Sequence, residues 1–260
     1  MPGLKIKPMK RWVDELSGVG SAEPFVIQRR GRHLSCLRLP APQRLSNKRR
    51  TAILAHPMRR YAKYWFKEGQ RIRIYHELGY DVVLFDFNGF GESDRIDLFF
   101  WRDAEAVIRH MSDDSLNDHL ILHGVSFGAY HMLRALSVLP IGSGVVVETS
   151  NRSMLDYWGR WPGLRIILKF QYDRGHPLLR EYDVIDALRS LNRPDLRVQF
   201  IACSEDRIAS PEEMADLAEC LALEVEKVLT VFQGVGHMEA PKADLDKFRS
   251  VLMSVANREP

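Results

Sequence analysis

A serine between two glycines gives the chain its clearest chemical signal. The segment GVSFG at residues 124–128 follows the apolar run HLILH and precedes apolar residues at helical spacing. A serine on a tight turn from strand to helix projects its hydroxyl group, and glycines two positions away let neighbouring backbone pass. The helix N-terminus also favours a developing negative charge. So short a pattern recurs by chance, but its context makes Ser126 the candidate nucleophile.

A serine hydroxyl needs a base, and the base needs an acid that orients it. For a nucleophile on this kind of turn, the expected chain order is serine, then Asp or Glu, then His. Asp206 follows the apolar run 198–203, and His237 follows the run 224–232. Both positions are the carboxyl ends of expected strands, the edge at which open parallel sheets bind ligands. We therefore predict a catalytic triad of Ser126, His237 and Asp206.

Other residues compete for the roles of base and acid. Most of the nine histidines are expected to be structural, whereas His237 lies after a glycine-containing loop and before the last expected helix. Glu205 is adjacent to Asp206, and Glu148 is the last residue of the expected strand at 144–148. Some hydrolases place their acid at that earlier strand. Asp206 is the favoured acid, with Glu148 as the principal alternative.

The elements that position these residues follow from hydrophobic patterning. Apolar runs rich in Val, Ile, Leu and Phe alternate with segments of helical period, which is typical of a parallel sheet with helices on both faces. The expected strands are 51–56, 82–87, 119–123, 144–148, 198–203 and 224–232. Two earlier runs alternate around Gly31 and predict an antiparallel edge hairpin. The expected fold class is α/β, in a single domain spanning residues 1–260.

Four segments have apolar residues on one helical face, and they predict helices at about 101–111, 127–136, 211–221 and 245–255. The third begins with Ser210, Pro211 and Glu213. These residues suit the N-cap, N1 and N3 positions of a capping box. This helix directly follows the loop that carries Asp206, so its start should fix the path of that loop.

One stretch of about 45 residues, between Thr149 and Pro194, mixes aromatic, aliphatic and arginine side chains. It is too long for a plain connection in a compact domain. We predict a helical lid insertion at about 150–195, with Trp158 and Trp161 contributing to substrate binding. The alternative is an ordinary helical excursion that has no contact with substrate.

Composition excludes several other classes of protein. The 37 basic and 34 acidic residues give a net charge of +3, too small an excess to indicate nucleic-acid binding. The chain has no apolar stretch of about 18 residues, and no run of signal-peptide length follows the basic N-terminus. Its three cysteines are far apart in the sequence, and no two of them form a C-x-x-C pair. These features favour a cytoplasmic protein without a disulfide framework.

No motif for a metal or a nucleotide cofactor occurs. The sequence contains no H-E-x-x-H, no P-loop, and no G-x-G-x-x-G after a first strand. We therefore expect no cofactor and no metal. The expected partner is a small acyl substrate, and no feature indicates an oligomeric state.

Over residues 25–257 the chain resembles the α/β-hydrolase superfamily. Besides the serine turn, the segment DFNGFGES at residues 86–93 is similar to the D-x-x-G-x-G-x-S turn after that family's fourth strand. We expect this turn to be structural. The resemblance implies an α/β-hydrolase fold, with a mostly parallel central sheet, helices on both faces and a short helical lid.

The family commonly has a His-Gly pair after its third strand, and the loop there supplies an oxyanion donor. Here the pair is His56-Pro57, and proline has no N–H to donate. The donor from this loop is therefore expected at Met58. The second donor is expected at Phe127, directly after the nucleophile.

Basic residues follow this loop. Arg59, Arg60 and Lys63 could hold a carboxylate or phosphate of the substrate, because arginine forks suit both groups. The alternative is a solvated basic turn.

These features together predict a serine hydrolase of the carboxylesterase or thioesterase class, which acts through an acyl-enzyme. A serine nucleophile argues against dehalogenase and epoxide hydrolase chemistry, for which this superfamily uses aspartate. Acyl transfer by the same triad and peptide hydrolysis remain alternatives. A non-catalytic binding protein is a further alternative, which the retention of all three triad residues disfavours.

Overall fold

The computed structural model describes residues 22–43, 49–58, 62–68, 70–114, 117–153, 163, 166–167, 169–170, 174 and 184–256. Within these ranges one sheet has eight strands, in the spatial order β1-β2-β4-β3-β5-β6-β7-β8. The strands are β1 (Glu23–Arg29), β2 (Arg32–Leu39), β3 (Arg49–Ala55), β4 (Asp81–Phe85), β5 (Asn117–Val125), β6 (Gly144–Glu148), β7 (Arg197–Cys203) and β8 (Glu226–Phe232).

The sheet is mostly parallel, as the sequence predicts. Strands β3 to β8 run parallel to one another, whereas β2 is antiparallel to both β1 and β4. The expected hairpin is confirmed, with Arg29 paired to Arg32 across a two-residue turn. Arg30 and Gly31 both have positive φ, at 52° and 69°. Two left-handed residues give a turn whose twist matches that of the flanking strands.

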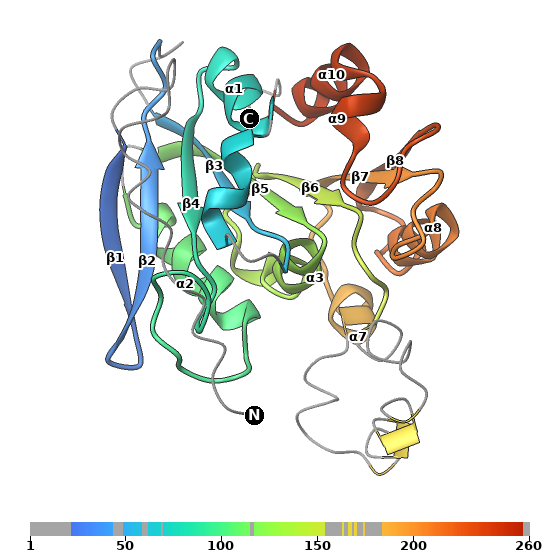
Figure 1. The fold of residues 1–260 in the computed structure, drawn as a ribbon, viewed down its shortest axis with the longest axis horizontal. Coiled ribbons are helices and arrows are strands. Elements are labelled where there is room, and N and C mark those ends of the chain that lie inside the picture. Colours follow the sequence, from blue (N-terminus) through green and yellow to red (C-terminus); the bar gives the residue numbers. More distant parts are fainter. Residues whose placement is uncertain are drawn as a thin grey trace.

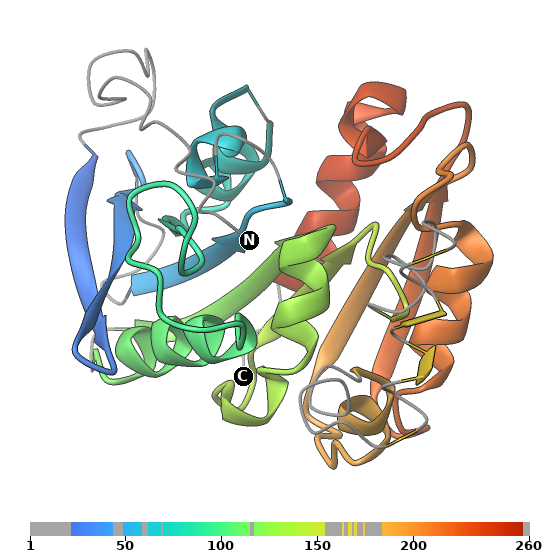
Figure 2. The same cartoon turned by 60° about the horizontal axis from the view of Figure 1, so that its bottom comes forward.

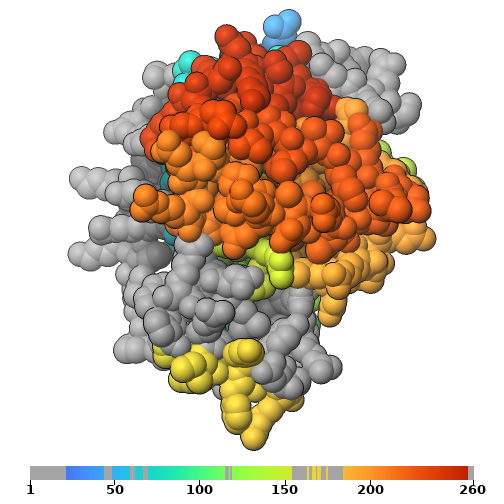
Figure 3. Space-filling model, turned by 90° about the vertical axis from the view of Figure 1, so that its right-hand side faces the viewer, coloured from blue at the N-terminus to red at the C-terminus, as the bar shows by residue number. Residues whose placement is uncertain are grey.

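Helices cover both faces of the sheet (Figures 1 and 2). One face carries α2 (Trp101–Ser112), α3 (Phe127–Leu133), η3 (Leu136–Val138), α7 (Val184–Arg189) and α8 (Pro211–Glu219). The other carries η2 (Ala62–Glu68), α1 (Gln70–Glu77), α9 (Ala240–Ala243) and α10 (Leu245–Ala256). Figure 3 views the molecule from the side of α8, β8 and α10, where the coloured surface comes mainly from residues after 184.

Central strands are buried on both sides because alternate side chains enter the two cores. Ile53 and Val83 belong to the core beneath α2 and α3, whereas Leu54 and Val82 belong to the core beneath α1 and α10. All five residues of β4 and of β6 are buried. This double burial explains why these strands read as continuous apolar runs rather than alternating ones.

The capping box of α8 is confirmed. The Ser210 hydroxyl oxygen accepts a hydrogen bond from the Glu213 amide at 3.2 Å, and the Glu213 carboxylate accepts one from the Ser210 amide at 2.9 Å. Pro211 occupies the first helical position. The start of α8 is therefore fixed, and with it the end of the loop that carries Asp206.

The turn at 86–93 is held by the carboxylate of Asp86. That carboxylate accepts the amide of Glu92 at 2.9 Å, and the Ser93 hydroxyl donates to the Asp86 carbonyl at 2.7 Å. A Cβ atom at Gly91, where φ is +48°, would lie 2.2 Å from the same carboxylate. Only glycine fits there, in agreement with the expected structural role of this turn.

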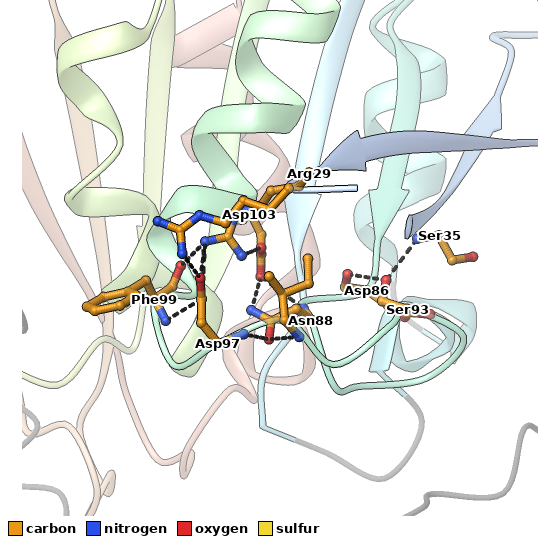
Figure 4. A network of polar contacts seen from close by, with 10 residues as sticks. Arg29, Ser35, Asp86, Asn88, Ser93, Asp97, Phe99 and Asp103 are labelled. Atoms are coloured by element: carbon orange, nitrogen blue, oxygen red, sulfur yellow. Dashed lines mark hydrogen bonds and ion pairs between the residues drawn. The ribbon is translucent and has the colours of Figure 1, made fainter. Parts of the chain in front are cut away.

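A second buried network continues from this turn (Figure 4). Asn88 donates to the carboxylate of Asp103 through its amide at 2.9 Å and its side chain at 2.8 Å. Arg29 of β1 donates to the other oxygen of Asp103 at 2.8 Å and to Asp97 at 2.9 Å. The network ties the edge hairpin, the turn and α2 together, since each contributes at least one of these side chains.

Most of the predicted lid segment at 150–195 lies outside the described residues, including Trp158 and Trp161. Of its described side chains, Ile166, Ile167 and Phe170 are exposed. The segment returns to the core at α7, where Val184 and Leu188 are buried. The single domain with a lid remains a prediction.

Candidate active site

Ser126 is the single residue between β5 and α3. Its backbone has φ 53° and ψ −114°. This conformation is unfavourable for any residue that has a side chain, and it persists only where neighbouring groups hold it. Two hydrogen bonds do so. The Ser126 amide donates to the Glu148 carbonyl at 2.8 Å, and its carbonyl accepts from the Tyr130 amide at 3.0 Å. The serine is thus held on a sharp turn at the carboxyl edge of the sheet.

The flanking glycines are required by close backbone approach. A Cβ atom at Gly124 would lie 2.4 Å from the Cα atom of Ala129, and one at Gly128 would lie 2.2 Å from the carbonyl oxygen of Ala55. No side chain fits at either distance. The physical reason for the G-x-S-x-G pattern given by the sequence is therefore confirmed.

The structure brings together the three residues of the predicted triad. The Nε2 atom of His237 lies 2.8 Å from the hydroxyl oxygen of Ser126, and its Nδ1 atom lies 2.7 Å from the carboxylate of Asp206. Ser126 follows β5, Asp206 follows β7 and His237 follows β8. The carboxyl ends of these three strands lie at one edge of the sheet. When Nδ1–H donates to the carboxylate, Nε2 is left to accept the serine proton.

Asp206 is itself held in place. The oxygen that does not face His237 accepts the amides of Ile208 at 2.7 Å and Ala209 at 2.9 Å. Asn151 supports the same loop by donating to the Ile208 carbonyl at 2.7 Å. The carboxylate therefore cannot rotate without losing two hydrogen bonds.

The acid and base loops are also joined to each other. The amide of Ser204 donates to the Phe232 carbonyl at 2.8 Å, and the amide of Glu205 donates to the Val235 carbonyl at 3.0 Å. The Ser204 hydroxyl accepts the amide of Gly234 at 2.9 Å. These contacts fix the loop after β8 against the loop after β7.

Glu148, the alternative acid, faces other partners. Its carboxylate accepts hydrogen bonds from Arg71, one of them at 2.8 Å, and lies 3.2 Å from the Nε2 atom of His123. Burial alone would raise the pKa of Glu148, but the Arg71 charge and the hydrogen bonds lower it to about 2. Since the Nδ1 atom of His237 is bonded to Asp206, the geometry favours Asp206 as the acid.

No protein-family model and no curated protein sequence matches the chain. Solved structures do. An esterase of Pyrococcus furiosus matches with a TM-score of 0.70 at 18% identity, over 95% of this chain and 93% of that one. A Xanthomonas campestris α/β serine hydrolase without a lid matches with a TM-score of 0.60 at 22% identity, over 92% of this chain and 97% of that one.

The chain has the α/β-hydrolase fold. An esterase from Exiguobacterium antarcticum is also similar in structure to this chain, with a TM-score of 0.63 at 16% identity over 91% of this chain and 100% of that one. The α/β class predicted from the residues and the α/β-hydrolase fold implied by the resemblance are both confirmed.

In this α/β-hydrolase fold, the loop after β3 lies directly against the serine turn. The Cβ position of Gly128 is 2.2 Å from the Ala55 carbonyl oxygen and 2.8 Å from that of His56, so the first turn of α3 touches the start of the loop carrying Met58. Phe127 is the first residue of α3, and its amide has no acceptor within the helix. The amides of Met58 and Phe127 remain our candidate oxyanion donors.

His56 orders the same loop from inside. It is fully buried, with Nδ1 2.8 Å from the Pro57 carbonyl and Nε2 3.2 Å from the Phe87 amide, which donates to it. Burial lowers the pKa of His56, so the ring is neutral and can donate at Nδ1 while accepting at Nε2. The histidine thereby ties the loop after β3 to the turn after β4.

For Lys63, both predictions are wrong: it is placed neither to hold a substrate anion nor on a solvated turn. Its side chain is buried, and its ammonium group lies 2.7 Å from Asp86, 2.8 Å from Glu92 and 2.9 Å from the Ser35 hydroxyl. A lysine neutralised by two carboxylates is not available to a substrate anion. Arg59 and Arg60 lie outside the described residues.

An aromatic cluster around Phe127, the residue after Ser126, was not predicted. Ring centroids of Phe100, Phe90 and His131 lie 5.2, 5.5 and 4.3 Å from that of Phe127. Phe90 and Phe100 are only half-buried and pack at the edge of the core. The signal for this cluster was the density of phenylalanines between residues 85 and 100, a segment predicted only as the end of a strand and a turn.

Other reactive groups in the described part of the chain are not poised for chemistry. Burial raises the pKa of Cys36 to about 12 and that of Cys203 to about 11, so both stay protonated.

Among the described residues, no group of three or more His, Cys, Asp or Glu side chains could hold a metal ion. None of the described helices is long and apolar enough to cross a membrane.

Proposed function

We propose that the protein is a serine hydrolase that cleaves carboxylic esters or thioesters through an acyl-enzyme. One observation carries this proposal: His237 is hydrogen-bonded to Ser126 on one side and to Asp206 on the other, at the carboxyl edge of an α/β-hydrolase sheet. The esterases and the serine hydrolase of similar fold support this reading.

In the first half-reaction, the hydroxyl oxygen of Ser126 attacks the substrate carbonyl while Nε2 of His237 takes its proton. Asp206 stabilises the imidazolium that forms. The amides of Met58 and Phe127 donate to the developing oxyanion. His237 then gives its proton to the departing alkoxide or thiolate, which leaves the acyl group on Ser126.

In the second half-reaction, a water molecule replaces the leaving group. His237 takes a proton from the water as it attacks the acyl carbonyl, and then returns that proton to Ser126. The products are a carboxylic acid and the free serine. If an alcohol, amine or thiol replaced water, the same steps would transfer the acyl group instead.

The substrate that best suits the surroundings joins an apolar acyl group to a polar or anionic leaving portion. The half-buried rings of Phe90 and Phe100, next to Phe127, offer apolar surface beside the nucleophile. Arg59 and Arg60 supply positive charge shortly after the oxyanion loop in the sequence. We further propose that the segment at 150–195, with Trp158 and Trp161, covers the acyl group as a lid.

Hydrolysis of a p-nitrophenyl ester series from acetate to octanoate, with the matching thioesters, tests the proposal. Ser126→Ala should lower kcat by roughly 10⁴–10⁶. Because the change removes only one hydroxyl, the free energy of unfolding should change by less than about 1 kcal/mol. Activity of the pure variant within about tenfold of the unmodified enzyme would contradict the nucleophile assignment.

A further inference from the structure

A buried ion pair behind the triad plays no part in the mechanism above. Arg71 of α1 is 3% exposed and Glu148 at the end of β6 is 0% exposed. The Nε atom of Arg71 donates to Glu148 at 2.8 Å, and its Nη2 atom donates to the second oxygen of the same carboxylate. Nη2 also donates to the carbonyl oxygen of Met238 at 3.3 Å.

These contacts link the backbones that carry the nucleophile and the base. The carbonyl of Glu148 accepts the amide of Ser126 at 2.8 Å, so the backbone of Glu148 fixes the serine turn. Met238 directly follows His237 and has a positive φ of 65°. A methionine keeps this unfavourable conformation only where neighbouring groups hold it, and the bond from Arg71 is one such contact.

Both partners of the ion pair are fixed by further contacts. Burial lowers the pKa of His123, so the ring is neutral; its Nε2–H can donate to Glu148 at 3.2 Å while Nδ1 accepts from the Tyr75 hydroxyl at 3.0 Å. The guanidinium carbon of Arg71 lies 5.0 Å from the Trp65 ring centroid and 5.4 Å from that of Phe248. The fork of Arg71 therefore has one orientation.

We infer that Arg71 is a positioning residue, which holds the loop carrying His237 in register with Ser126 by joining the Met238 carbonyl to Glu148. The inference rests on the proposed function, because only a reaction between Ser126 and His237 makes this register matter for rate. A misplacement of about 1 Å at reacting groups can cost roughly 100-fold in rate. Arg71 touches no substrate in this account.

A buried arginine could instead contribute stability alone, and the chain offers a matched control for that reading. Arg29 is 7% exposed and bonds Asp103 and Asp97 at 2.8 and 2.9 Å. Its network, shown in Figure 4, shares none of these residues with the network of Arg71. Arg29→Lys therefore perturbs a comparable buried ion pair whose arginine bonds Asp103, Asp97 and the Phe99 carbonyl rather than residues beside the triad in the chain.

Arg71→Lys keeps the positive charge but replaces the planar fork by one ammonium group, which cannot span both oxygens of Glu148 and the Met238 carbonyl. With p-nitrophenyl butyrate, kcat should fall roughly 10- to 100-fold with KM within about twofold. The rate of labelling by a fluorophosphonate should fall by the same factor. Arg29→Lys should lower the melting temperature similarly and leave kcat within about twofold.

A second measurement reads the position of His237 without turnover. In protein labelled with ¹⁵N-histidine, the proton shared between His237 and Asp206 should give a low-field NMR signal, assigned by its loss in His237→Gln. We expect this signal in the unmodified protein and in Arg29→Lys, and a shifted or broadened signal in Arg71→Lys. If the unmodified protein neither cleaves esters nor reacts with the fluorophosphonate, the proposed function fails, and this signal still tests the inference.

Unchanged kcat and an unchanged NMR signal in Arg71→Lys would overturn the inference. If Arg71→Lys does not fold, the double variant Arg71→Met/Glu148→Gln tests the positioning role of Arg71 instead. This variant leaves no unpaired buried charge and keeps the backbone carbonyl at position 148. The same loss of kcat in the folded double variant would support the positioning role. A folded double variant with the kcat and NMR signal of the unmodified enzyme would overturn it.

Discussion

The carboxylate of Asp206 lies 2.7 Å from the Nδ1 atom of His237 and cannot turn away from it, because two backbone amides bind its other oxygen. This contact selects the ring tautomer in which Nδ1 carries the proton and Nε2 faces Ser126. The orientation of the His237 ring is thus set by the end of the loop before α8, where Ile208 and Ala209 supply the amides.

Asp206→Asn should lower kcat by about 10⁴ with little change in KM. An asparagine amide can donate to Nδ1, and it then favours the tautomer whose Nε2 already holds a proton and cannot accept the serine proton. Steady-state kinetics with p-nitrophenyl butyrate measure the effect. A larger loss of kcat in Glu148→Gln than in Asp206→Asn would move the acid to the end of β6.

Gly128→Ala should lower both the melting temperature and kcat. Its Cβ atom would lie 2.2 Å from the Ala55 carbonyl oxygen, so α3 must move away from β3 and separate Met58 from Phe127. Gly163→Ala is the control for stability, since a Cβ atom there meets nothing within 4 Å. Calorimetry and kinetics that showed no difference between Gly128→Ala and the unmodified protein would contradict the close approach.

Stability should fall in acid because of the network around Glu148. Its folded pKa of about 2 lies below the ordinary 4.5, so the stabilisation is complete above pH 4.5 and is lost as the pH falls toward 2. Burial also lowers the pKa of His123 below 6.5, which adds a loss as the pH falls below that value. At pH 3.5 the loss from Glu148 is on the order of 1 kcal/mol, because that pH is one unit below the ordinary pKa.

Urea unfolding between pH 7 and pH 3.5 measures this loss. The double variant Arg71→Met/Glu148→Gln lacks the titrating carboxylate, so its free energy of unfolding should depend less steeply on pH below 4.5. Equal slopes for the double variant and the unmodified protein would show that other groups dominate acid unfolding.

The double change Arg59→Ala/Arg60→Ala should raise KM for an anionic ester about tenfold with kcat little changed. A neutral ester with the same acyl group should be affected far less. Added salt should reduce the difference, because exposed charges are screened. Equal effects on the two esters would assign these arginines to a solvated turn.

Lys63→Met should behave differently from the change at the two arginines. It leaves the buried carboxylate of Asp86 without its cation, so the melting temperature should drop. The ratio of KM values for the anionic and neutral esters should stay the same. A change in that ratio would return Lys63 to the substrate site.

The sequence predicted the triad because each member leaves a local mark. Ser126 stands between two glycines that close packing requires, and His237 and Asp206 follow apolar runs that are strands. The hairpin around Gly31 and the capping box at Ser210 were predicted for the same reason, since both depend on residues near one another in the chain.

The features that the sequence did not reveal depend on distant partners. Lys63 looked like part of a basic turn, because Asp86 and Glu92 reach it only after β4 has paired beside β3. Glu148 ends β6 and Asp206 follows the end of β7, so the sequence pattern favoured Asp206 as the acid but left Glu148 as an alternative. The position of Arg71 on α1 distinguishes them, and that position follows from how α1 packs on the sheet.

The site of covalent labelling by a fluorophosphonate shows which residue is the nucleophile. The reagent phosphonylates a serine whose hydroxyl is activated by a neighbouring base, and peptide mass spectrometry locates the adduct. We predict a single adduct on the peptide that contains Ser126, no adduct in Ser126→Ala, and much slower labelling in His237→Gln. An adduct at another residue, or no adduct on the folded protein, would contradict the assignment of Ser126 as the nucleophile.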